Sequence, residues 1–180
     1  MKLLLLDLND SPMNIKQLSI GCLLILLAQS MLLAKDYNIL AYGAVADGST
    51  MNTKAIQAAI DAAHADGGGR VILPKGRFLS GSIVLKSGVE LHLEKKGVLL
   101  GSTDLADYVR IHRWKSLVLA DSAINIGISG KGMLDGQGAR LGLATDSLYY
   151  VGEFDSAQYE FAEKRVKAYL RPQLIEFVNC

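Results

Sequence analysis

The hydrophobic and polar positions between Ser82 and Gly136 repeat at a fixed offset of 35 residues (124 − 89). In each copy apolar residues alternate with polar ones and a glycine follows, which is the pattern of a half-buried strand that ends at a corner. The matched pairs are Ile83/Val118, Ser87/Ser122, Val89/Ile124, Leu91/Ile126, Leu93/Ile128, Gly97/Gly132, Leu99/Leu134 and Gly101/Gly136. Each copy therefore predicts a strand, a corner and a second strand.

Two copies at one spacing predict coils that stack on one another, because a single coil cannot bury its inward face whereas stacked coils share a core. A β-sandwich with evenly spaced strands would show a similar alternation. The glycines repeat in register with the apolar residues, which favours the solenoid and an all-β fold class. The segment Thr103–Lys115 breaks the alternation, so we expect it to form a loop that leaves the first coil.

Ahead of the repeat, the sequence predicts a strand and a helix. Tyr37–Ala46 is expected to be a short strand with a turn at Asp47-Gly48, and Thr50–Asp66 an amphipathic helix. Thr50 or Asn52 is suited to capping its free amides. The apolar face of the helix consists of Ile56, Ala59, Ile60 and Ala63. Because the first coil of a stack has an open apolar end, we expect this helix to cover it.

The triple glycine Gly67–Gly69 ends this helix and leads into a strand at Arg70–Leu73. Nucleotide-binding glycine motifs open a helix instead, and no Gly-Lys-Ser/Thr element follows, so a phosphate-binding loop is excluded. Pro74–Gly76 predicts a turn, and Phe78 opens the first full coil.

The pattern changes after the second copy. Leu141 to Tyr159 is irregular, and Ala157–Leu170 predicts a helical insertion on the coil stack, either as a solvated face or as a wall of a substrate groove. Two ion pairs in the favourable order support that helix, Glu160/Lys164 and Glu163/Lys167. Arg171–Cys180 resumes a strand, since Leu174-Ile175 matches Leu117-Val118 at an offset of 57 (174 − 117).

The first 34 residues are interpreted as a signal peptide that precedes a domain at residues 35–180. A basic segment, the apolar run Leu18–Ala34 and a small residue at its end form the usual order, and the run is too short and too polar for a membrane span. Met13 is an alternative start, and cleavage is expected after Ala34. Cys22 after Gly21 resembles the cysteine of a lipoprotein cleavage site. Such a site ends the apolar run, whereas Cys22 stands at its start.

The composition excludes two classes of function. The chain has 180 residues, enough for one domain with a sizeable core, and half of them are apolar. Its net charge of +1 gives no electrostatic basis for binding nucleic acid or an anionic membrane. Its 18 glycines suit a turn-rich β protein. After cleavage Cys180 would be the sole cysteine, so no internal disulfide is expected.

Residues Tyr37–Cys180 resemble the opening of glycoside hydrolase family 28, the polygalacturonase-type enzymes. The GA-x-x-DG turn, the helix and the GGG-to-LPKG strand are also shared with pectate lyase-like proteins and tailspikes. More specific are GSIVLKSGVELHLEKKGVLLGSTDLADY, ISGKGMLDGQG and RPQLIEFVNC, which are similar to consecutive coils of the family. The resemblance implies a right-handed parallel β-helix, here truncated after about two and a half coils, that acts on pectin without a cofactor or metal.

The resemblance assigns no catalytic residue to this chain. Members of the family hydrolyse glycosidic bonds with inversion, using aspartates from an Asn-Thr-Asp motif and an Asp-Asp pair. Gly-His-Gly and Arg-Ile-Lys segments assist them, and all four motifs lie on coils after the RPQLIEFVNC-like strand. None of the four motifs occurs here. Asp135 is the one candidate for a catalytic acid on the repeated segment, and its counterpart 35 positions earlier is Leu100, so Asp135-Gly136 is interpreted as a turn.

Two further sets of residues carry side chains suited to binding or catalysis. His64, His92 and His112 stand on three separate segments, which predicts surface histidines and neither a metal site nor a catalytic triad. Trp114 could stack on a sugar ring while Arg110, Arg113 and Lys115 hold a carboxylate. A basic loop around a half-buried tryptophan is the alternative interpretation.

The sequence as a whole predicts the first part of an exported, polygalacturonase-like hydrolase. We expect an acidic pectic polysaccharide as partner, an exported location (periplasm, cell surface or medium), a monomer when complete, and an inactive 180-residue chain. A non-catalytic carbohydrate-binding or tailspike-like β-helix and a pectate lyase-like enzyme are the alternatives; endo and exo action stay open. An uncovered last coil would also make the chain prone to aggregation or partial unfolding.

Overall fold

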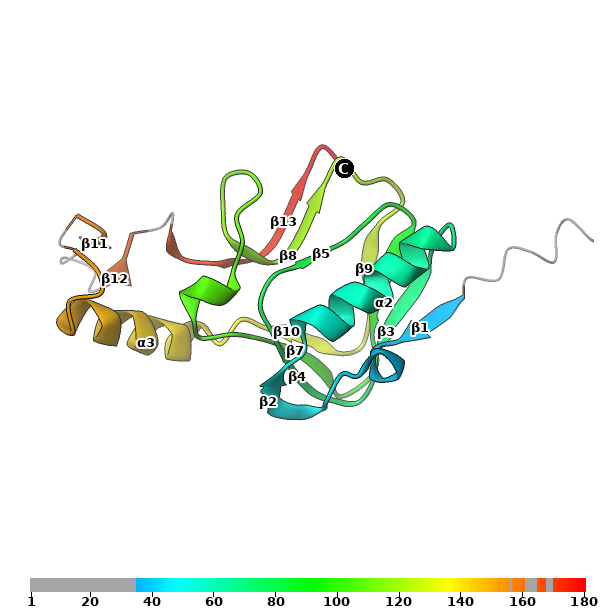
Figure 1. The fold of residues 1–180 in the computed structure, drawn as a ribbon, viewed down its shortest axis with the longest axis horizontal. Coiled ribbons are helices and arrows are strands. Elements are labelled where there is room, and N and C mark those ends of the chain that lie inside the picture. The colour runs from blue at the N-terminus through cyan, green and yellow to red at the C-terminus, as the bar shows by residue number, and fades with distance from the viewer. Residues whose placement is uncertain (1–34, 156, 161–164, 168–169) are drawn as a thin grey trace, which may run out of the picture. The chain divides into compact units, whose positions relative to one another are not determined.

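The computed structural model describes residues 35–155, 157–160, 165–167 and 170–180 (Figure 1). The predicted signal peptide, its cleavage site and the alternative start at Met13 lie outside the described residues. Within them, no helix combines the length and the apolar character that crossing a membrane requires.

The described chain is a right-handed parallel β-helix with three sheets. Sheet A contains β1 (Asp36–Asn38), β3 (Gly69–Leu73), β6 (Val89–Leu93) and β9 (Gly127–Gly130). Sheet B contains β2 (Asp47–Met51), β4 (Gly76–Ser80), β7 (Gly97–Gly101) and β10 (Met133–Asp135). Sheet C contains β5 (Ile83–Val84), β8 (Ser116–Asp121) and β13 (Gln173–Val178). The chain visits A, B and C in turn, as coils require.

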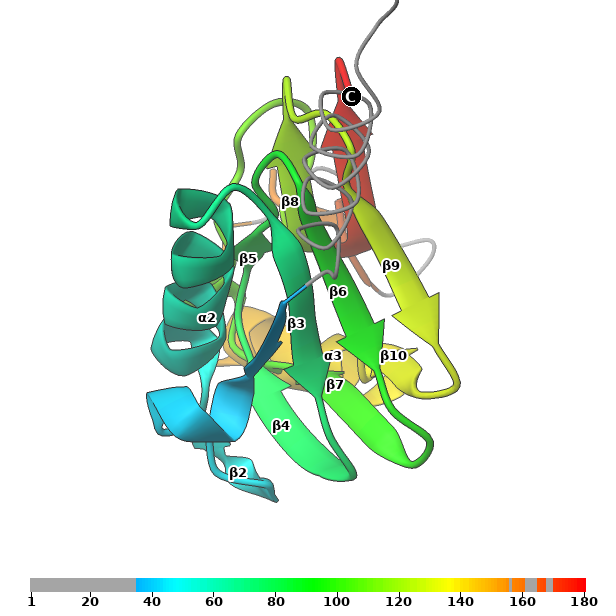
Figure 2. The same ribbon diagram turned by 90° about the vertical axis from the view of Figure 1, so that its right-hand side faces the viewer.

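The solenoid prediction is confirmed, and the sandwich alternative is excluded for these sheets. Each neighbouring pair of strands within sheets A, B and C is parallel. Counted from Phe78 in β4, the strands form two full coils (β4-β5-β6 and β7-β8-β9) and two strands of a third (β10 and β13). Figure 2 shows the strands of sheet A next to one another, with β3 and β6 between β1 and β9.

The predicted 35-residue register holds in two sheets and fails in the third. Ile83 pairs with Val118 and Leu99 with Leu134, both at 35 positions, whereas Leu91 pairs with Ile128 at 37 positions (128 − 91). Measured between paired residues, the step from sheet C to sheet A lengthens from six positions (84 to 90) to eight (119 to 127), and the step from sheet A to sheet B shortens from five (93 to 98) to three (130 to 133). A slip of two residues keeps every side chain on its face, so alternation cannot reveal it. Ile124, predicted to face inward opposite Val89, is 66% exposed.

The glycines at the corner between sheets A and B are required by close approach of the backbone. A Cβ atom on Gly97 would lie 2.7 Å from the carbonyl oxygen of Pro74, and one on Gly132 would lie 2.5 Å from that of Gly97. The corners of successive coils therefore stack backbone on backbone, which explains why the glycines repeat with the strands.

The predicted strand at Tyr37–Ala46 is wrong beyond Asn38. β1 ends there, and a 3-10 helix, η1 (Ile39–Tyr42), follows. The side chain of Asn38 accepts a hydrogen bond from the amide of Leu40 at 3.0 Å, which starts the turn, and Gly43 ends it in the left-handed conformation. The predicted turn at Asp47-Gly48 is instead the beginning of β2.

The predicted helix is α2 (Thr53–Ala65), and the four residues of its apolar face are fully buried. Asn52 occupies the N-cap position, but its side chain makes no cap bond. That side chain is buried and pairs with the backbone N–H and C=O of Val45, so it ties the helix start to the preceding loop. The helix lies against β5, the first strand of sheet C, where it covers the end of the stack as expected (Figure 2).

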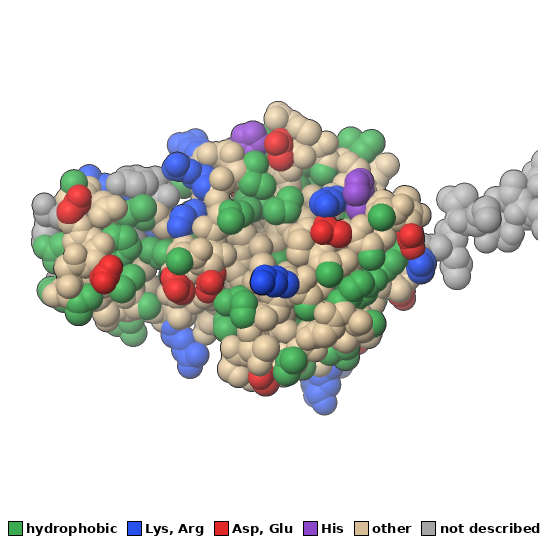
Figure 3. Space-filling view, viewed as in Figure 1, with side chains coloured by type: hydrophobic (Ala, Val, Ile, Leu, Met, Phe, Trp, Pro, Cys, Tyr) green, Lys and Arg blue, Asp and Glu red, His purple; other side chains and the backbone are tan. Residues whose placement is uncertain are grey.

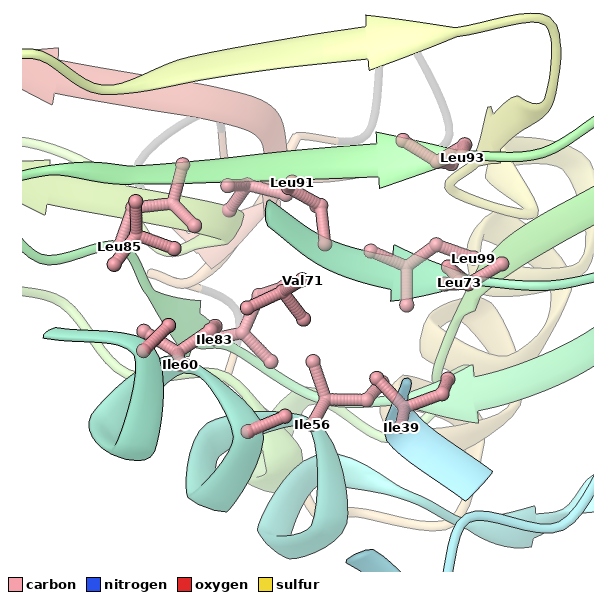
Figure 4. Packing of buried hydrophobic residues seen from close by; sticks show 14 of the residues in the cluster. Ile39, Ile56, Ile60, Val71, Leu73, Ile83, Leu85, Leu91, Leu93 and Leu99 are labelled. Carbon is pink, nitrogen blue, oxygen red and sulfur yellow. The ribbon is translucent and has the colours of Figure 1, made fainter. Parts of the chain in front are cut away.

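The core is filled by inward side chains stacked coil on coil. Val71, Leu91 and Leu99 are fully buried among the residues that Figure 4 shows between the sheets and α2. Burial declines at the last coil: Val118 is inaccessible, whereas its neighbour Ile175 on β13 is 44% exposed. The end of the described stack opposite α2 is therefore open and apolar.

The insertion after β10 differs from its prediction. The helix is α3 (Gly138–Tyr150), and the predicted helix at Ala157–Leu170 is wrong where it is described: β11 (Tyr159–Glu160) and β12 (Arg165–Val166) pair antiparallel there. Tyr159 is buried, stacks on Tyr149 and donates a hydrogen bond to Asp146 at 2.8 Å. This packing on α3 outweighs ion pairs that contribute only about 0.3–0.5 kcal/mol each.

Candidate active-site face

Two long connections leave the stack at the corner between sheets B and C. The first runs from β7 to β8 and holds the predicted loop Thr103–Lys115 with a 3-10 turn, η2 (Leu105–Asp107). The second runs from β10 to β13 and holds α3. Both project on the same side of the stack (Figure 1). We refer to residues 102–115, 133–145 and 171–176 together as the B–C corner.

The base of the first loop is firmly anchored. Tyr108 is 4% exposed and donates a hydrogen bond to the carbonyl of Ser102 at 2.7 Å. Ser82 accepts a hydrogen bond from the amide of Val109 at 2.9 Å and donates one to the carbonyl of Ser116 at 2.6 Å. Burial raises the pKa of Tyr108 to about 12, so its hydroxyl stays protonated and acts as a structural donor.

The tip of this loop carries the predicted basic cluster. Arg110 and Lys115 form an antiparallel bridge, and Arg110 and Arg113 are exposed. The guanidinium of Arg113 lies 4.9 Å from the centre of the half-buried Trp114 ring. The ammonium group of Lys115 donates one hydrogen bond to the carbonyl of Leu105 at 2.7 Å, which ties the end of the loop to its η2 turn and leaves two further N–H donors. Figure 3 shows Lys and Arg side chains gathered in this region.

Glu176 of β13 holds the tip from the next coil, a contact that the sequence analysis did not predict. One of its oxygens, Oε1, accepts hydrogen bonds from the amides of Arg113 at 3.2 Å and Trp114 at 3.0 Å. Glu176 alternates with the inward positions Ile175 and Phe177, so the sequence indicates that its side chain points outward. The sequence does not indicate its partner, because Trp114 lies 62 positions away. Only coil stacking brings the two together.

Two adjoining cavities lie at the B–C corner. One, of about 280 Å³, is lined by Tyr108 of the first loop together with residues of β10, α3 and β13. The other, of about 480 Å³, is lined by Arg171 together with residues of α3 and the start of β13. They share the lining residues Gly138, Leu141, Pro172 and Gln173. The corner is thus hollowed where the two connections meet.

The acid side chains near this corner have local structural partners. Asp135 pairs with Leu100 in the ladder, as predicted, and accepts a hydrogen bond from the amide of Gln137 at 2.9 Å, which makes a local turn. Asp107 accepts one from Ser102 at 2.5 Å. The hydrogen bond from His112 lowers the pKa of Asp121, with Ser122 adding to the effect.

The three histidines lie on separate elements. His64 of α2 contacts the carbonyl of Ser87 at 2.9 Å, and His112 lies 3.1 Å from Asp121. His92 of β6 lies 2.6 Å from the hydroxyl of Ser129, which donates to Glu90. In the described part of the chain, no three His, Cys, Asp or Glu side chains converge on a common point.

Comparison with known proteins finds relatives that resemble this chain over part of their length. A family model described as rhamnogalacturonase A/epimerase, pectate lyase-like, matches residues 37–96. Exo-poly-α-D-galacturonosidase of Dickeya chrysanthemi is 40% identical over 121 residues, which cover 58% of this chain and 20% of that protein. The family 28 exopolygalacturonase of Yersinia enterocolitica is 36% identical, with a TM-score of 0.54 over 58% of this chain and 21% of that one. The resemblance to family 28 is confirmed.

The polygalacturonase-like chain covers only part of these relatives. It spans about a fifth of the Dickeya and Yersinia proteins and 39% of the exopolygalacturonase of Thermotoga maritima, which is 27% identical with a TM-score of 0.58 over 81% of this chain. The family-model match ends at residue 96, so it covers the turn, α2 and β3, which were expected to be shared widely, and also the first coil, which was expected to be more specific.

Proposed function

We propose that this polygalacturonase-like chain is part of an exported glycoside hydrolase that cleaves α-linked galacturonic acid chains of pectin with inversion. The observation that carries the proposal is the 40% identity over 121 residues to a protein named as an exo-poly-α-D-galacturonosidase. The exposed Arg110 and Arg113 at the B–C corner support an acidic substrate, because guanidinium groups bind carboxylates in a bidentate manner. The complete protein would act as a monomer.

We propose further that the 180-residue chain does not hydrolyse this substrate. Inverting hydrolysis needs a general acid and a general base on carboxyl groups roughly 6.5–9.5 Å apart. The sequence holds neither the Asn-Thr-Asp motif nor the Asp-Asp pair of the family. Asp107, Asp121 and Asp135 at or beside the B–C corner bind their own neighbours, as a structural role requires.

Two measurements on the purified chain test the proposal. In affinity gel electrophoresis we expect polygalacturonate, but not neutral dextran, to retard the chain. In a reducing-sugar assay on polygalacturonate we expect no release above the blank, and clear turnover would contradict the inactivity. Unsaturated products that absorb in the ultraviolet would support the pectate lyase-like alternative instead. Absence of retardation would contradict the proposed substrate.

A further inference from the structure

The cavity between α3 and the start of β13 contains an unsatisfied cationic donor. Arg171 lines this cavity of about 480 Å³, and its Nε–H is buried with no hydrogen-bond partner among the described residues. Buried polar groups are nearly always paired, and an unpaired one costs about 1–3 kcal/mol or more when charged. An orphan donor on the wall of a cavity therefore points to a partner that enters from outside.

Among the residues that the structure describes, the remaining wall of the cavity holds no acid that could serve as this partner. Its other residues are Gly138, Leu141, Gly142, Thr145, Pro172 and Gln173. Leu141 contributes an apolar surface, and the buried hydroxyl of Thr145 donates within α3 to the carbonyls of Leu141 and Gly142, which leaves only its acceptor capacity. Gln173 adds a side-chain amide. One cation, two neutral polar groups and an apolar patch fit an acidic sugar better than a neutral apolar ligand.

The backbone around the cation is constrained. Pro172 follows Arg171 directly, and a residue before proline is restricted to extended conformations. The amide of Gln173 donates to the carbonyl of Lys115 at 2.8 Å, which joins the start of β13 to β8. A guanidinium held on such a support presents Nε–H and an Nη–H side by side, the arrangement that binds a carboxylate through two hydrogen bonds.

We propose that this cavity is a binding subsite for the carboxylate of a sugar acid, with Arg171 as the specificity-determining residue. The inference rests on the proposed function, which supplies the galacturonic acid chain, and it names the place on this chain where one acidic unit binds. The ligand carboxylate would satisfy Nε–H, and the sugar ring would lie along Leu141.

The test measures the unfolding temperature and the ligand affinity of an Arg171 variant. The proposal predicts that the affinity falls while the unfolding temperature does not. Because Nε–H has no partner to lose, we expect Arg171→Gln to unfold in the absence of ligand at the same temperature as the wild type or a higher one. A purely structural arginine would instead lower that temperature. By isothermal titration calorimetry, we expect the same variant to bind trigalacturonate about 10- to 100-fold more weakly.

Controls separate the subsite from the proposed function. Arg140→Gln changes an exposed arginine of α3 that does not line this cavity, and its affinity for trigalacturonate should be unchanged. The fully methyl-esterified trimer should bind the wild type and Arg171→Gln alike. Equal affinity of Arg171→Gln and the wild type for trigalacturonate would overturn the subsite alone. A wild type that binds trimannuronate but not trigalacturonate, in an Arg171-dependent manner, would keep the subsite and overturn the proposed function.

Discussion

Gln57 of α2 pairs with Val84 of β5 through both atoms of its side-chain amide. Its Nε2 donates to the carbonyl of Val84 at 3.1 Å, and its Oε1 accepts from the amide of Val84 at 2.9 Å. A side-chain amide has the same donor and acceptor as a peptide unit, so Gln57 takes the place of a preceding strand on the edge of sheet C. The lid therefore closes the stack by hydrogen bonding as well as by apolar burial.

Removing this amide should destabilise the fold. We expect Gln57→Ala to lower the free energy of unfolding by about 1–3 kcal/mol, because the backbone N–H and C=O of Val84 would both lose the hydrogen bond to Gln57. Urea denaturation followed by circular dichroism measures the change. Lys54→Ala, on the exposed side of the same helix, should change it by less than about 0.5 kcal/mol. Equal effects of the two variants would contradict the role given to Gln57.

Alanine substitutions at two glycines should act in opposite directions. At Gly97 the new Cβ would meet the carbonyl oxygens of Pro74 and Leu73 at 2.7 and 2.8 Å, so we expect Gly97→Ala to cost about 1–3 kcal/mol. At Gly142, inside α3, the new Cβ would meet no atom within 4 Å apart from its chain neighbours and the nearby backbone of the helix itself. Gly142→Ala should therefore add about 0.5–1 kcal/mol through helix propensity. Thermal unfolding of both variants measures these changes. An unchanged unfolding temperature of Gly97→Ala would contradict the close backbone contact between successive corners.

Acid should remove a stabilising contribution from Asp47. Hydrogen bonds from the hydroxyl and amide of Thr50, at 2.6 and 2.7 Å, and from the amide of Ser49 hold the pKa of this carboxyl well below its usual range. A depressed pKa means that the contribution is complete above the unfolded value of about 4 and is lost as pH falls through the lower folded value. Asp47→Asn should show a smaller loss of stability between about pH 4 and 2 than the wild type. An acid-induced loss of stability in Asp47→Asn equal to that of the wild type would contradict this role of Asp47.

The contact from Glu176 should order the loop tip. We expect Glu176→Ala to free the amides of Arg113 and Trp114, which should shift the emission of the sole tryptophan to longer wavelength and speed tryptic cleavage after Arg110 or Arg113. Glu176→Gln keeps an acceptor oxygen and should behave like the wild type. If Glu176→Ala leaves both the emission and the cleavage rate unchanged, the tip is ordered by other contacts.

The open end of the stack should drive self-association. β9, β10 and β13 are the last strands of their sheets among the described residues, and Met133 on β10 is 57% exposed. We expect light scattering after size exclusion to show a mass that rises with concentration, and Met133→Lys to reduce it by placing a charge at the edge. Leu143→Lys, on the exposed face of α3, is the control and should not. A monodisperse wild type that melts cooperatively would contradict this expectation.

The candidate site was predictable only in part. The loop Thr103–Lys115 and its basic residues were indicated by a break in the alternation, which is a local property of the sequence. The contact of Glu176 with Trp114 and the orphan donor of Arg171 were not indicated, because each depends on residues that coil stacking or α3 packing brings together. Lys115, a predicted ligand-binding cation, also donates a hydrogen bond to the carbonyl of Leu105, a loop contact that the alternation did not indicate.

The sequence by itself determined the coils, the buried face of each strand and the position of the lid helix, because apolar alternation and helical periodicity are set by neighbouring residues. Tertiary structure alone decided the 37-residue register between β6 and β9, the place of the helix in the insertion and the partners of Gln57 and Glu176. The physical reason is that a two-residue slip, a weak helix and a side-chain hydrogen bond all leave the local pattern unchanged, and packing between coils selects among them.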